Sequence, residues 1–180
     1  MFVALVHPMK ISIAEFKPVH RKSVFSILRD VTMPWGRKWC DNILQMYCLE
    51  CSSPDFMLKY VALQRGNGGR RKGDARSRER GRAAGNVVGT ILLRHAIDVY
   101  VIEFLAVRKG LRGEGVGTEL VNHAEQVAKS KGAKGLRVDT ASEFKHNISF
   151  YQKLGFEVGG FVKNYYERSD SQVFLTKLLS

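Results

Sequence analysis

The stretch LRGEGVG, residues 111–117, holds three glycines and one arginine between two apolar segments. VYVIEFLAV (99–107) precedes it and is typical of a buried strand, while TELVNHAEQVAKS (118–130) follows with apolar residues at helical spacing. Glycines between a strand and a helix let backbone N–H groups approach an anion, and the helix dipole adds roughly half a positive charge there. The stretch therefore predicts a phosphate-binding loop, with a tight turn that binds no ligand as the alternative.

Two common nucleotide-binding motifs do not account for this loop. A Walker A motif ends in Gly-Lys-Ser/Thr, a sequence that the stretch lacks. A dinucleotide fingerprint fits partly, since Gly113 and Gly115 follow a strand and Asp139 ends the next one. However, Thr118 takes its third glycine position, and too few residues follow Asp139 to complete a doubly wound sheet.

Hydrophobic periodicity and turn residues divide the rest of the chain into short elements. We expect strands at 10–16, 56–63, 86–95, 99–107, 136–140, 157–166 and 171–179, and helices at 19–31, from after Trp39 to about Glu50, at 118–130 and in a segment ending near Leu154. Gly132 and Gly155 are expected to end the last two helices. The order of elements predicts an α+β, or mixed α/β, fold.

Composition bounds the class of protein. The chain has 180 residues, 44% of them hydrophobic and 26% charged, which suits one globular domain. No run of 18 apolar residues is present, so no membrane partner is expected, and residues 1–9 are expected to form a loose N-terminal extension. The odd set of Cys40, Cys48 and Cys51 argues against a disulfide framework and favours a cytoplasmic location, and no second ligand pair completes a zinc site.

Half of the net charge of +12 lies in one segment. Residues 65–85 carry eight Arg or Lys, two acids and six glycines, with no large apolar residue. Such a segment cannot bury a core, so we expect a disordered basic insertion between two strands. It is either a solvated insertion or an electrostatic contact for RNA or the ribosome, and it has no aromatic residues for base stacking.

Two motifs together resemble those of the GNAT acetyltransferases, which bind acetyl-CoA. Their [Q/R]-x-x-G-x-[G/A] pattern is matched by residues 112–117, and NISFYQKLGF (147–156) is similar to their N…Y…G-F segment in altered spacing. The resemblance implies a mostly antiparallel sheet of about seven strands, flanked by four helices and splayed between strands 4 and 5. It also implies a single domain at 10–180 that contains the basic insertion, with acetyl-CoA and no metal as cofactor.

The resemblance also implies roles for residues in these motifs. The residues implied to contact the cofactor are Leu105, Ala106, Val107, Arg112, Gly113, Glu114, Gly115, Val116, Gly117, Asn147 and Tyr151. Main-chain groups at 105–107 would pair with the pantetheine arm, and the N–H groups of 112–117 would hold the pyrophosphate. Tyr151 would protonate the departing thiolate, with an ordinary aromatic packing role as the alternative.

Two carboxylates are candidates for the general base of an acyl transfer to an amine. Glu103 lies in the apolar strand before the glycine loop, and strand alternation places it on one face with Val101 and Leu105. Asp139 ends the next strand. A carboxylate is the right type of group to take a proton from an amine, directly or through water. A structural hydrogen bond is the alternative role for Glu103.

The closing segment points to the acceptor. VKNYYERSD (162–170) resembles the same segment of protein N-terminal acetyltransferases, of the methionine-acting and the ribosomal-protein-alanine types. The resemblance implies that Tyr165 and Tyr166 bind the substrate backbone and that Met33, Pro34 and Trp35 line the pocket for its first side chain. Val101 and Arg137 stand where the methionine-acting type has its catalytic Tyr and His.

Three functions therefore compete. The first is acetyl transfer from acetyl-CoA to the α-amino group of a protein or peptide N-terminus, by direct transfer in a ternary complex. The second is acetyl transfer to a small amine or a lysine side chain. The third is a cofactor-binding scaffold without turnover, whose basic insertion docks on RNA or the ribosome.

Overall fold

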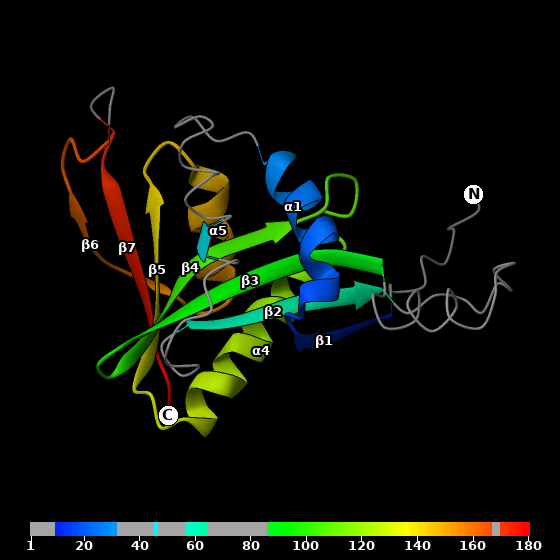
Figure 1. Ribbon diagram of the computed structural model, residues 1–180. Helices are drawn as coiled ribbons and strands as arrows, with labels where there is room; N and C mark the ends of the chain where they lie inside the picture. The colour runs from blue at the N-terminus through cyan, green and yellow to red at the C-terminus, as the bar shows by residue number, and fades with distance from the viewer. Residues whose placement is uncertain (1–9, 32–44, 47–56, 65–85, 167–169) are drawn as a thin grey trace, which may run out of the picture. The chain divides into compact units, whose positions relative to one another are not determined.

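The computed structural model describes residues 10–31, 45–46, 57–64, 86–166 and 170–180 (Figure 1). Seven strands form one sheet in the order β1-β2-β3-β4-β5-β7-β6. β4 runs parallel to β5, whereas the pairs β1–β2, β5–β7 and β6–β7 are antiparallel. The predicted mixed, seven-stranded α/β fold is confirmed.

The boundaries of the elements follow the hydrophobic pattern. In chain order the elements are β1 (Ile11–Glu15), the 3-10 helix η1 (Pro18–His20), α1 (Arg21–Arg29), β2 (Met57–Gln64), β3 (Asn86–Ala96), β4 (Val99–Val107), α4 (Val116–Ser130), β5 (Gly135–Ala141), α5 (Lys145–Lys153), β6 (Glu157–Val162) and β7 (Gln172–Leu178). Three α-helices lie in the described ranges, against four expected. The expected helix up to Glu50 lies outside those ranges apart from Gln45 and Met46, which are helical.

Two boundaries differ from the expectation for a local reason. α4 begins at Val116, inside the glycine stretch, rather than at Thr118. The strand expected to run to Tyr166 ends at Val162, because the chain turns there and Asn164 takes a left-handed φ of 51°. The first of these differences brings the helix N-terminus into the predicted anion-binding loop.

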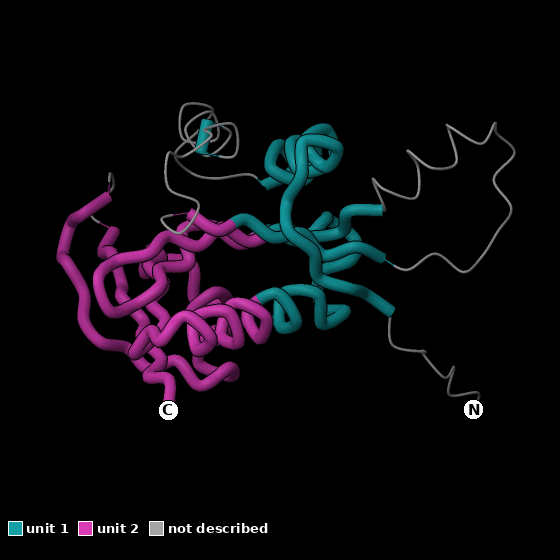
Figure 2. The backbone as a smooth tube through the Cα atoms, turned by 60° about the horizontal axis from the view of Figure 1, so that its bottom comes forward, with its two compact units in different colours: residues 1–49, 59–90, 106–120 teal, residues 50–58, 91–105, 121–180 magenta. Residues whose placement is uncertain are grey.

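The chain divides into two compact units (Figure 2). Unit 1 holds residues 1–49, 59–90 and 106–120, and unit 2 holds residues 50–58, 91–105 and 121–180. We describe the predicted site residues within each unit separately.

In unit 1, apolar contacts hold α1 and the first turns of α4. Val24, Ile27 and Leu28 of α1 are fully buried at i, i+3 and i+4, as the helical pattern predicts. A Cβ atom added to Gly89 on β3 would lie 3.0 Å from side-chain atoms of both Val116 and Leu120. A side chain at position 89 would therefore crowd the first turns of α4 and force Val116 or Leu120 to shift.

In unit 2, apolar side chains of the strands form the core. Its fully buried apolar side chains include Ile91, Leu92, Leu93, Leu136 and Leu175. Gly132 and Gly155 follow α4 and α5 with φ of +72° and +84°, which confirms their expected role in ending the two helices.

The two parallel strands of the sheet separate along their length. β4 pairs with β5 from Val99 opposite Gly135 to Ile102 opposite Val138. Both strands then continue, to Val107 and Ala141, beyond the last of these pairs. The predicted splay between the fourth and fifth strands is thus present, and it begins at Glu103 and Asp139.

Several predictions concern residues that the structure does not describe. They are the N-terminal extension 1–9, the pocket residues Met33, Pro34 and Trp35, the three cysteines and the basic insertion 65–85. Within the described part of the chain, none of the helices has the length and apolar character needed to cross a membrane.

Candidate active site

The glycine loop between β4 and α4 presents an open backbone. Gly110, Gly113 and Gly115 have φ of +88°, +86° and +83°, a left-handed conformation that glycine adopts without steric cost. A Cβ atom added to any of the three would meet no heavy atom within 4 Å. The described residues thus leave free space beside this backbone.

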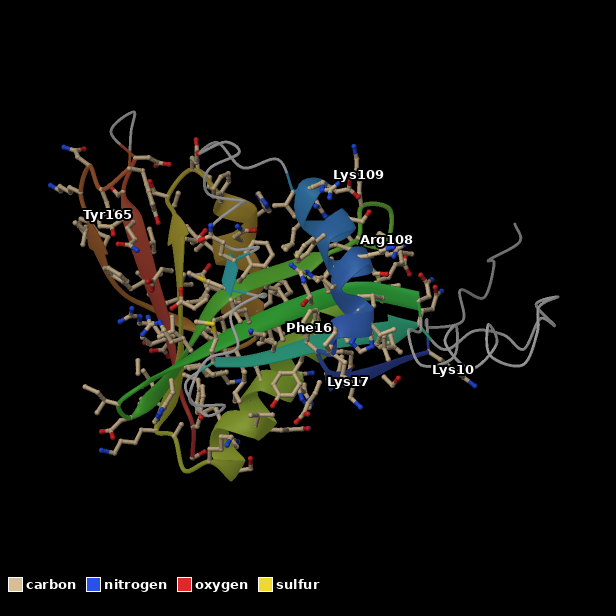
Figure 3. All side chains as sticks on the ribbon, viewed as in Figure 1. Lys10, Phe16, Lys17, Arg108, Lys109 and Tyr165 are labelled. Carbon is tan, nitrogen blue, oxygen red and sulfur yellow. The ribbon has the colours of Figure 1, made fainter. Side chains whose placement is uncertain are left out.

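Contacts with neighbouring backbone fix the start of the loop in unit 1. The Arg108 N–H donates to the Val88 carbonyl over 2.8 Å, and the Arg108 guanidinium donates to the Val87 carbonyl over 2.5 Å. The Leu111 N–H donates to the Arg108 carbonyl over 3.0 Å, and Arg112 Nε donates to the Val107 carbonyl over 3.3 Å. Figure 3 shows Arg108 and Lys109 where β4 leads into the loop. The loop is therefore anchored on the N-terminal side of Gly113 and Gly115.

The loop fits an anionic group. Within the described ranges, no N–H group of residues 112–117 donates a backbone hydrogen bond outside the helix. The first N–H groups of α4 have no partner within the helix, and they carry the positive end of its dipole. Glycine suits positions 113 and 115 because both have a left-handed φ, and a side chain at either position would extend into the open space beside this backbone. These residues suit the diphosphate of coenzyme A.

In unit 2, Glu103 is held by an arginine from the adjacent strand. Arg94 Nε on β3 lies 2.5 Å from Glu103 Oε1, and about a quarter to a third of each side chain is exposed. Charge-assisted hydrogen bonds are among the stronger ones in proteins. Glu103 is thus half-buried and engaged at the first position of β4 beyond its pairing with β5.

Asp139 lies at the corresponding position of β5 and has a second arginine beside it. Arg137 Nε lies 3.2 Å from Asp139 Oδ1, close enough for an ion pair but without hydrogen-bond alignment, and Arg137 also stacks over the Phe174 ring at 5.6 Å. Burial raises the pKa of the Asp139 carboxyl above its ordinary value. The charge and hydrogen bond of Arg137 oppose that rise, and the charge of Glu103 adds to it.

Gln172 links a tyrosine of the hairpin to this cluster. Gln172 Nε2 on β7 lies 3.5 Å from Asp139 Oδ2, and Gln172 also hydrogen-bonds Tyr166. Burial raises the pKa of Tyr166 to about 12, with a further contribution from the charge of Asp139. Tyr165, labelled in Figure 3, is 58% exposed. Its ring meets that of Tyr166 edge to face, with the ring centroids 5.0 Å apart. Tyr166 and Asp139 thus belong to one connected polar group.

Tyr151 and Asn147 both lie on α5. Tyr151 is buried between Phe150 and Phe156, with ring centroids 5.0 and 5.3 Å away. Burial raises the pKa of its phenol, so the hydroxyl stays protonated at physiological pH. Asn147 Nδ2 donates to Thr140 Oγ1 over 3.4 Å, which links α5 to the end of β5.

The structure thus brings Glu103, Asp139 and Tyr166 of the predicted site into one polar cluster of unit 2. Sequence analysis missed two members of this cluster, Arg94 and Gln172. Neither belongs to a motif, and only strand register reveals them. Among the described residues, no group of His, Cys, Asp and Glu is arranged to hold a metal ion.

A mixed sheet that parts between two parallel strands, together with a glycine loop that opens a helix, agrees with the class of acyltransferase that the resemblance implies. The chain belongs to the acetyltransferase (GNAT) family, whose model matches residues 44–156.

Curated relatives match part of the chain. YvbK of Bacillus subtilis (strain 168), an uncharacterized N-acetyltransferase, is 31% identical over 85 residues, which are 47% of this chain and 55% of YvbK. N-alpha-acetyltransferase 30 of Schizosaccharomyces pombe is 36% identical over 55 residues, which are 31% of this chain and 37% of that protein. The matched segments thus span about half of the length of these relatives or less.

Solved structures match more of the chain. The ribosomal-protein-S18-alanine N-acetyltransferase of Escherichia coli has a TM-score of 0.70 at 14% identity and covers 95% of both chains. Ard1 of Thermoplasma volcanium has a TM-score of 0.68 at 22% identity, over 94% of this chain and 98% of Ard1. A streptothricin acetyltransferase of Bacillus anthracis str. Ames, in complex with acetyl coenzyme A, has a TM-score of 0.58 at 23% identity, over 72% and 65%. At these identities the matches show a shared fold.

Proposed function

We propose that residues 10–180 form an N-acetyltransferase that moves an acetyl group from acetyl-CoA to the α-amino group of a protein or peptide N-terminus. The observation that carries this proposal is the open backbone of residues 112–117 at the start of α4, which suits a diphosphate. Family membership supports the choice of acetyl-CoA as the cofactor.

The cofactor would be held mainly by backbone groups. The N–H groups of residues 112–117 would bind its diphosphate, and Arg112 would add positive charge. Main-chain groups of Leu105, Ala106 and Val107 would pair with its pantetheine arm, since β4 has left β5 at this point. Asn147 would contact the same arm from α5. Acetyl-CoA supplies an activated acyl group as a thioester.

The hairpin between β6 and β7 supports a peptide acceptor. Tyr165 is exposed there, and its neighbour Tyr166 joins the polar cluster around Asp139. These two tyrosines would bind the backbone of the first residues of the substrate. The fold is shared with the ribosomal-protein-S18-alanine enzyme, and a segment is similar to N-alpha-acetyltransferase 30. Met33, Pro34 and Trp35 would contact the first side chain of the substrate.

The charge balance of the cluster also favours an N-terminus over a polyamine. Glu103 is paired with Arg94, and Asp139 with Arg137, so the two carboxylates are largely neutralised. A polyamine carries several positive charges and would bind better to an uncompensated acidic surface. An α-amino group carries at most one charge and is partly neutral at physiological pH, because its pKa is near 8.

The reaction would need no covalent enzyme intermediate. The neutral amine attacks the thioester carbonyl in a ternary complex, and positioning of the two substrates contributes much of the rate. Glu103 and Asp139 are the carboxylates available to accept the proton from the amine. Tyr151 stays protonated and would donate to the departing sulfur.

A second candidate function is acetylation of a small amine or a lysine side chain. It is favoured by one observation, the shared fold with the streptothricin acetyltransferase of Bacillus anthracis. This candidate uses the same cofactor loop and the same proton-transfer residues. It differs only in what the surface around Tyr165 and Tyr166 binds.

The test is a peptide array with acetyl-CoA, read by mass spectrometry. Each sequence is supplied with a free N-terminus, and again with a blocked N-terminus and a free lysine. We expect acetylation of free N-termini alone. Acetylation of lysines or polyamines, with no N-terminus modified, would reject the proposed acceptor and leave the cofactor assignment intact. CoA binding without any turnover would instead indicate a scaffold.

The basic insertion would determine where in the cell the enzyme encounters its acceptor. Its eight Arg and Lys residues would attract RNA or the ribosome, where N-termini emerge, and a cytoplasmic location is part of this proposal. Deletion of residues 66–84 should then abolish salt-sensitive RNA binding and leave peptide acetylation unchanged. Equal RNA binding with and without the insertion would remove this partner from the proposal.

A further inference from the structure

The hairpin between β6 and β7 meets the loop that joins β5 to α5. β5 pairs with β7 over its whole length, and the last pair is Ala141 opposite Gln172 (Figure 1). Beyond this pair, Ser142 begins the loop to α5, and Ser171 lies opposite it at the base of the hairpin. The contacts made there determine how the hairpin is held against the loop.

Side chains take over at this point from the backbone pairing of the two strands. The Ser142 N–H donates to the Ser171 carbonyl over 2.8 Å, as in the strand pairing before it. The Ser171 N–H, however, donates to two side-chain oxygens, Ser142 Oγ and Asp170 Oδ1, each 3.2 Å away. The Ser142 hydroxyl in turn donates to Asp170 Oδ1. A serine hydroxyl and a carboxylate therefore close the end of the β5–β7 pairing.

Asp170 connects this group to a tyrosine of the hairpin. Its carbonyl accepts a hydrogen bond of 3.1 Å from the Tyr166 N–H. Burial raises the pKa of Tyr166 to about 12, and the charge of Asp170 adds to the rise, together with those of Asp139 and Tyr165. The backbone of Asp170 thus holds Tyr166, while its side chain is held by Ser142.

The loop on the other side of this contact is fixed at both ends. Its first turn is closed by the Phe144 N–H, which donates to the Ala141 carbonyl over 3.0 Å. Asn147 on α5 donates to Thr140 Oγ1 on β5 over 3.4 Å. Ser142 therefore belongs to the ordered connection that leads into α5, the helix with the proposed proton donor Tyr151.

Resting on the proposed acetyl transfer, we propose that Ser142 and Asp170 are positioning residues for the acceptor, whose hydrogen bond holds Tyr165 and Tyr166 where the substrate backbone binds. Neither residue contacts substrate or cofactor in this proposal, since both act through the hairpin. Binding groups must be held within a fraction of an ångström by such supporting contacts. Loss of the bond should therefore weaken binding of the acceptor and leave binding of CoA as it is.

Steady-state kinetics of the full chain test this role. With acetyl-CoA and the best amine from the peptide array, Ser142→Ala should raise the KM of the acceptor at least about tenfold, the usual effect of losing a hydrogen bond to a charged group. It should keep more than about a third of kcat, because the proton-transfer groups are untouched. The KM of acetyl-CoA should not change. Ser142→Thr keeps the hydroxyl and should restore the KM of the acceptor.

Asp170→Leu removes the other partner of the same bond. It should raise the KM of the acceptor as Ser142→Ala does, and the double variant should be no worse than the weaker single variant, because one interaction is lost in all three. The matched control is Ser130→Ala, which also removes a serine hydroxyl bonded at the end of an element, to the Val127 carbonyl of α4. It should leave both KM values unchanged.

Three results overturn the proposal. They are an unchanged KM of the acceptor in Ser142→Ala, an equal rise in the KM of acetyl-CoA, and no recovery in Ser142→Thr. A residue that merely stabilises the fold would not change the KM of one substrate alone.

A second measurement needs no acceptor, so its outcome is independent of the proposed function. Amide hydrogen exchange, followed by NMR in the free protein, reports local opening of the hairpin. In Ser142→Ala the Tyr166 amide should exchange at least about tenfold faster than in the parent, because the residue that accepts its hydrogen bond is no longer held. The amides of Val138 and Leu175, a pair within the β5–β7 ladder, should exchange at the parent rate.

The exchange data separate this proposal from the proposed function. If the Tyr166 amide is not accelerated, or if all three amides are accelerated equally, the proposal is overturned even if N-termini are acetylated. The expected acceleration at Tyr166, without acetylation of any N-terminus, would count against the proposed acceptor only.

Discussion

The glycine loop of unit 1 and the polar cluster of unit 2 are built in opposite ways. The loop is one continuous stretch, residues 108–117, and the groups that we propose bind the cofactor are backbone N–H groups. The cluster gathers side chains from β3, β4, β5, β7 and the hairpin, and their binding properties depend on the charges beside them. A local motif thus fixes the loop, whereas tertiary contacts fix the cluster. The loop should respond to bulk and backbone strain, and the cluster to charge.

Gly115→Glu should weaken CoA binding by the glycine loop more than any other change considered. A side chain at this position enters the open space and brings a negative charge toward the phosphate. Loss of two charge-assisted hydrogen bonds, at about 2 kcal/mol each, would weaken CoA binding about 1,000-fold. Calorimetry with CoA measures this.

The matched control is Gly132→Glu. Gly132 also has a positive φ and open space around its missing Cβ, but it lies after the C-terminus of α4. The control carries the same backbone strain and the same added charge, so CoA should bind to it as to the parent. If the two variants bind CoA equally, the loop is not the anion site.

Tyr151→Phe tests unit 2 without changing a charge. The Tyr151 hydroxyl is protonated in the free enzyme because burial raises its pKa. Removal of the hydroxyl should therefore affect only proton donation to the departing sulfur. We expect kcat to fall about 100-fold and the dissociation constant for CoA to stay the same. Tyr60→Phe, which removes the hydroxyl of a buried tyrosine on β2, is the control. A Tyr151→Phe enzyme as fast as the parent would exclude this residue from proton transfer.

Gly89→Val tests the packing behind the loop. Its Cβ would lie 3.0 Å from side-chain atoms of Val116 and Leu120 and 3.2 Å from the Ala106 carbonyl oxygen. Overpacking of this kind costs about 2 kcal/mol, so the free energy of unfolding in urea should fall by that amount. Gly160→Val on β6 is the control, because the nearest atom to its added Cβ is 4.0 Å away. Equal stabilities of the two variants would contradict the close approach at Gly89.

The same contrast explains how much the sequence could predict. The described strands and helices and the glycine loop depend on local patterns, namely hydrophobic periodicity and the positions of glycines. Their boundaries were therefore predicted with small errors. The candidate bases Glu103 and Asp139 were also found, because a carboxylate in an apolar strand stands out. Arg94 and Gln172 were not, because an arginine or glutamine on a strand carries no signal until register brings it beside a carboxylate.

Two turns of the sheet, one after β6 and one between β3 and β4, also differ in whether local sequence or tertiary contacts determine them. Asn164 has a φ of 51° in the turn after β6, and asparagine tolerates this conformation. Ile97 has a φ of 56° in the turn between β3 and β4, where a β-branched residue is strained, and its side chain is 91% exposed. Pairing of two long apolar strands therefore determines the second turn, against its local preference.

Ile97→Asn should then stabilise the protein. Relief of the left-handed strain contributes about 1 kcal/mol, and little is lost because the isoleucine side chain buries almost no surface. The free energy of unfolding in urea measures the gain. Acetyl transfer should not change, because Ile97 belongs neither to the glycine loop nor to the polar cluster. Ile97→Val keeps the branched Cβ and should give no gain. If Ile97→Val and Ile97→Asn stabilise the protein equally, backbone strain at position 97 is not the cause of the gain. The turn would then be determined by its own sequence, as the glycine loop is.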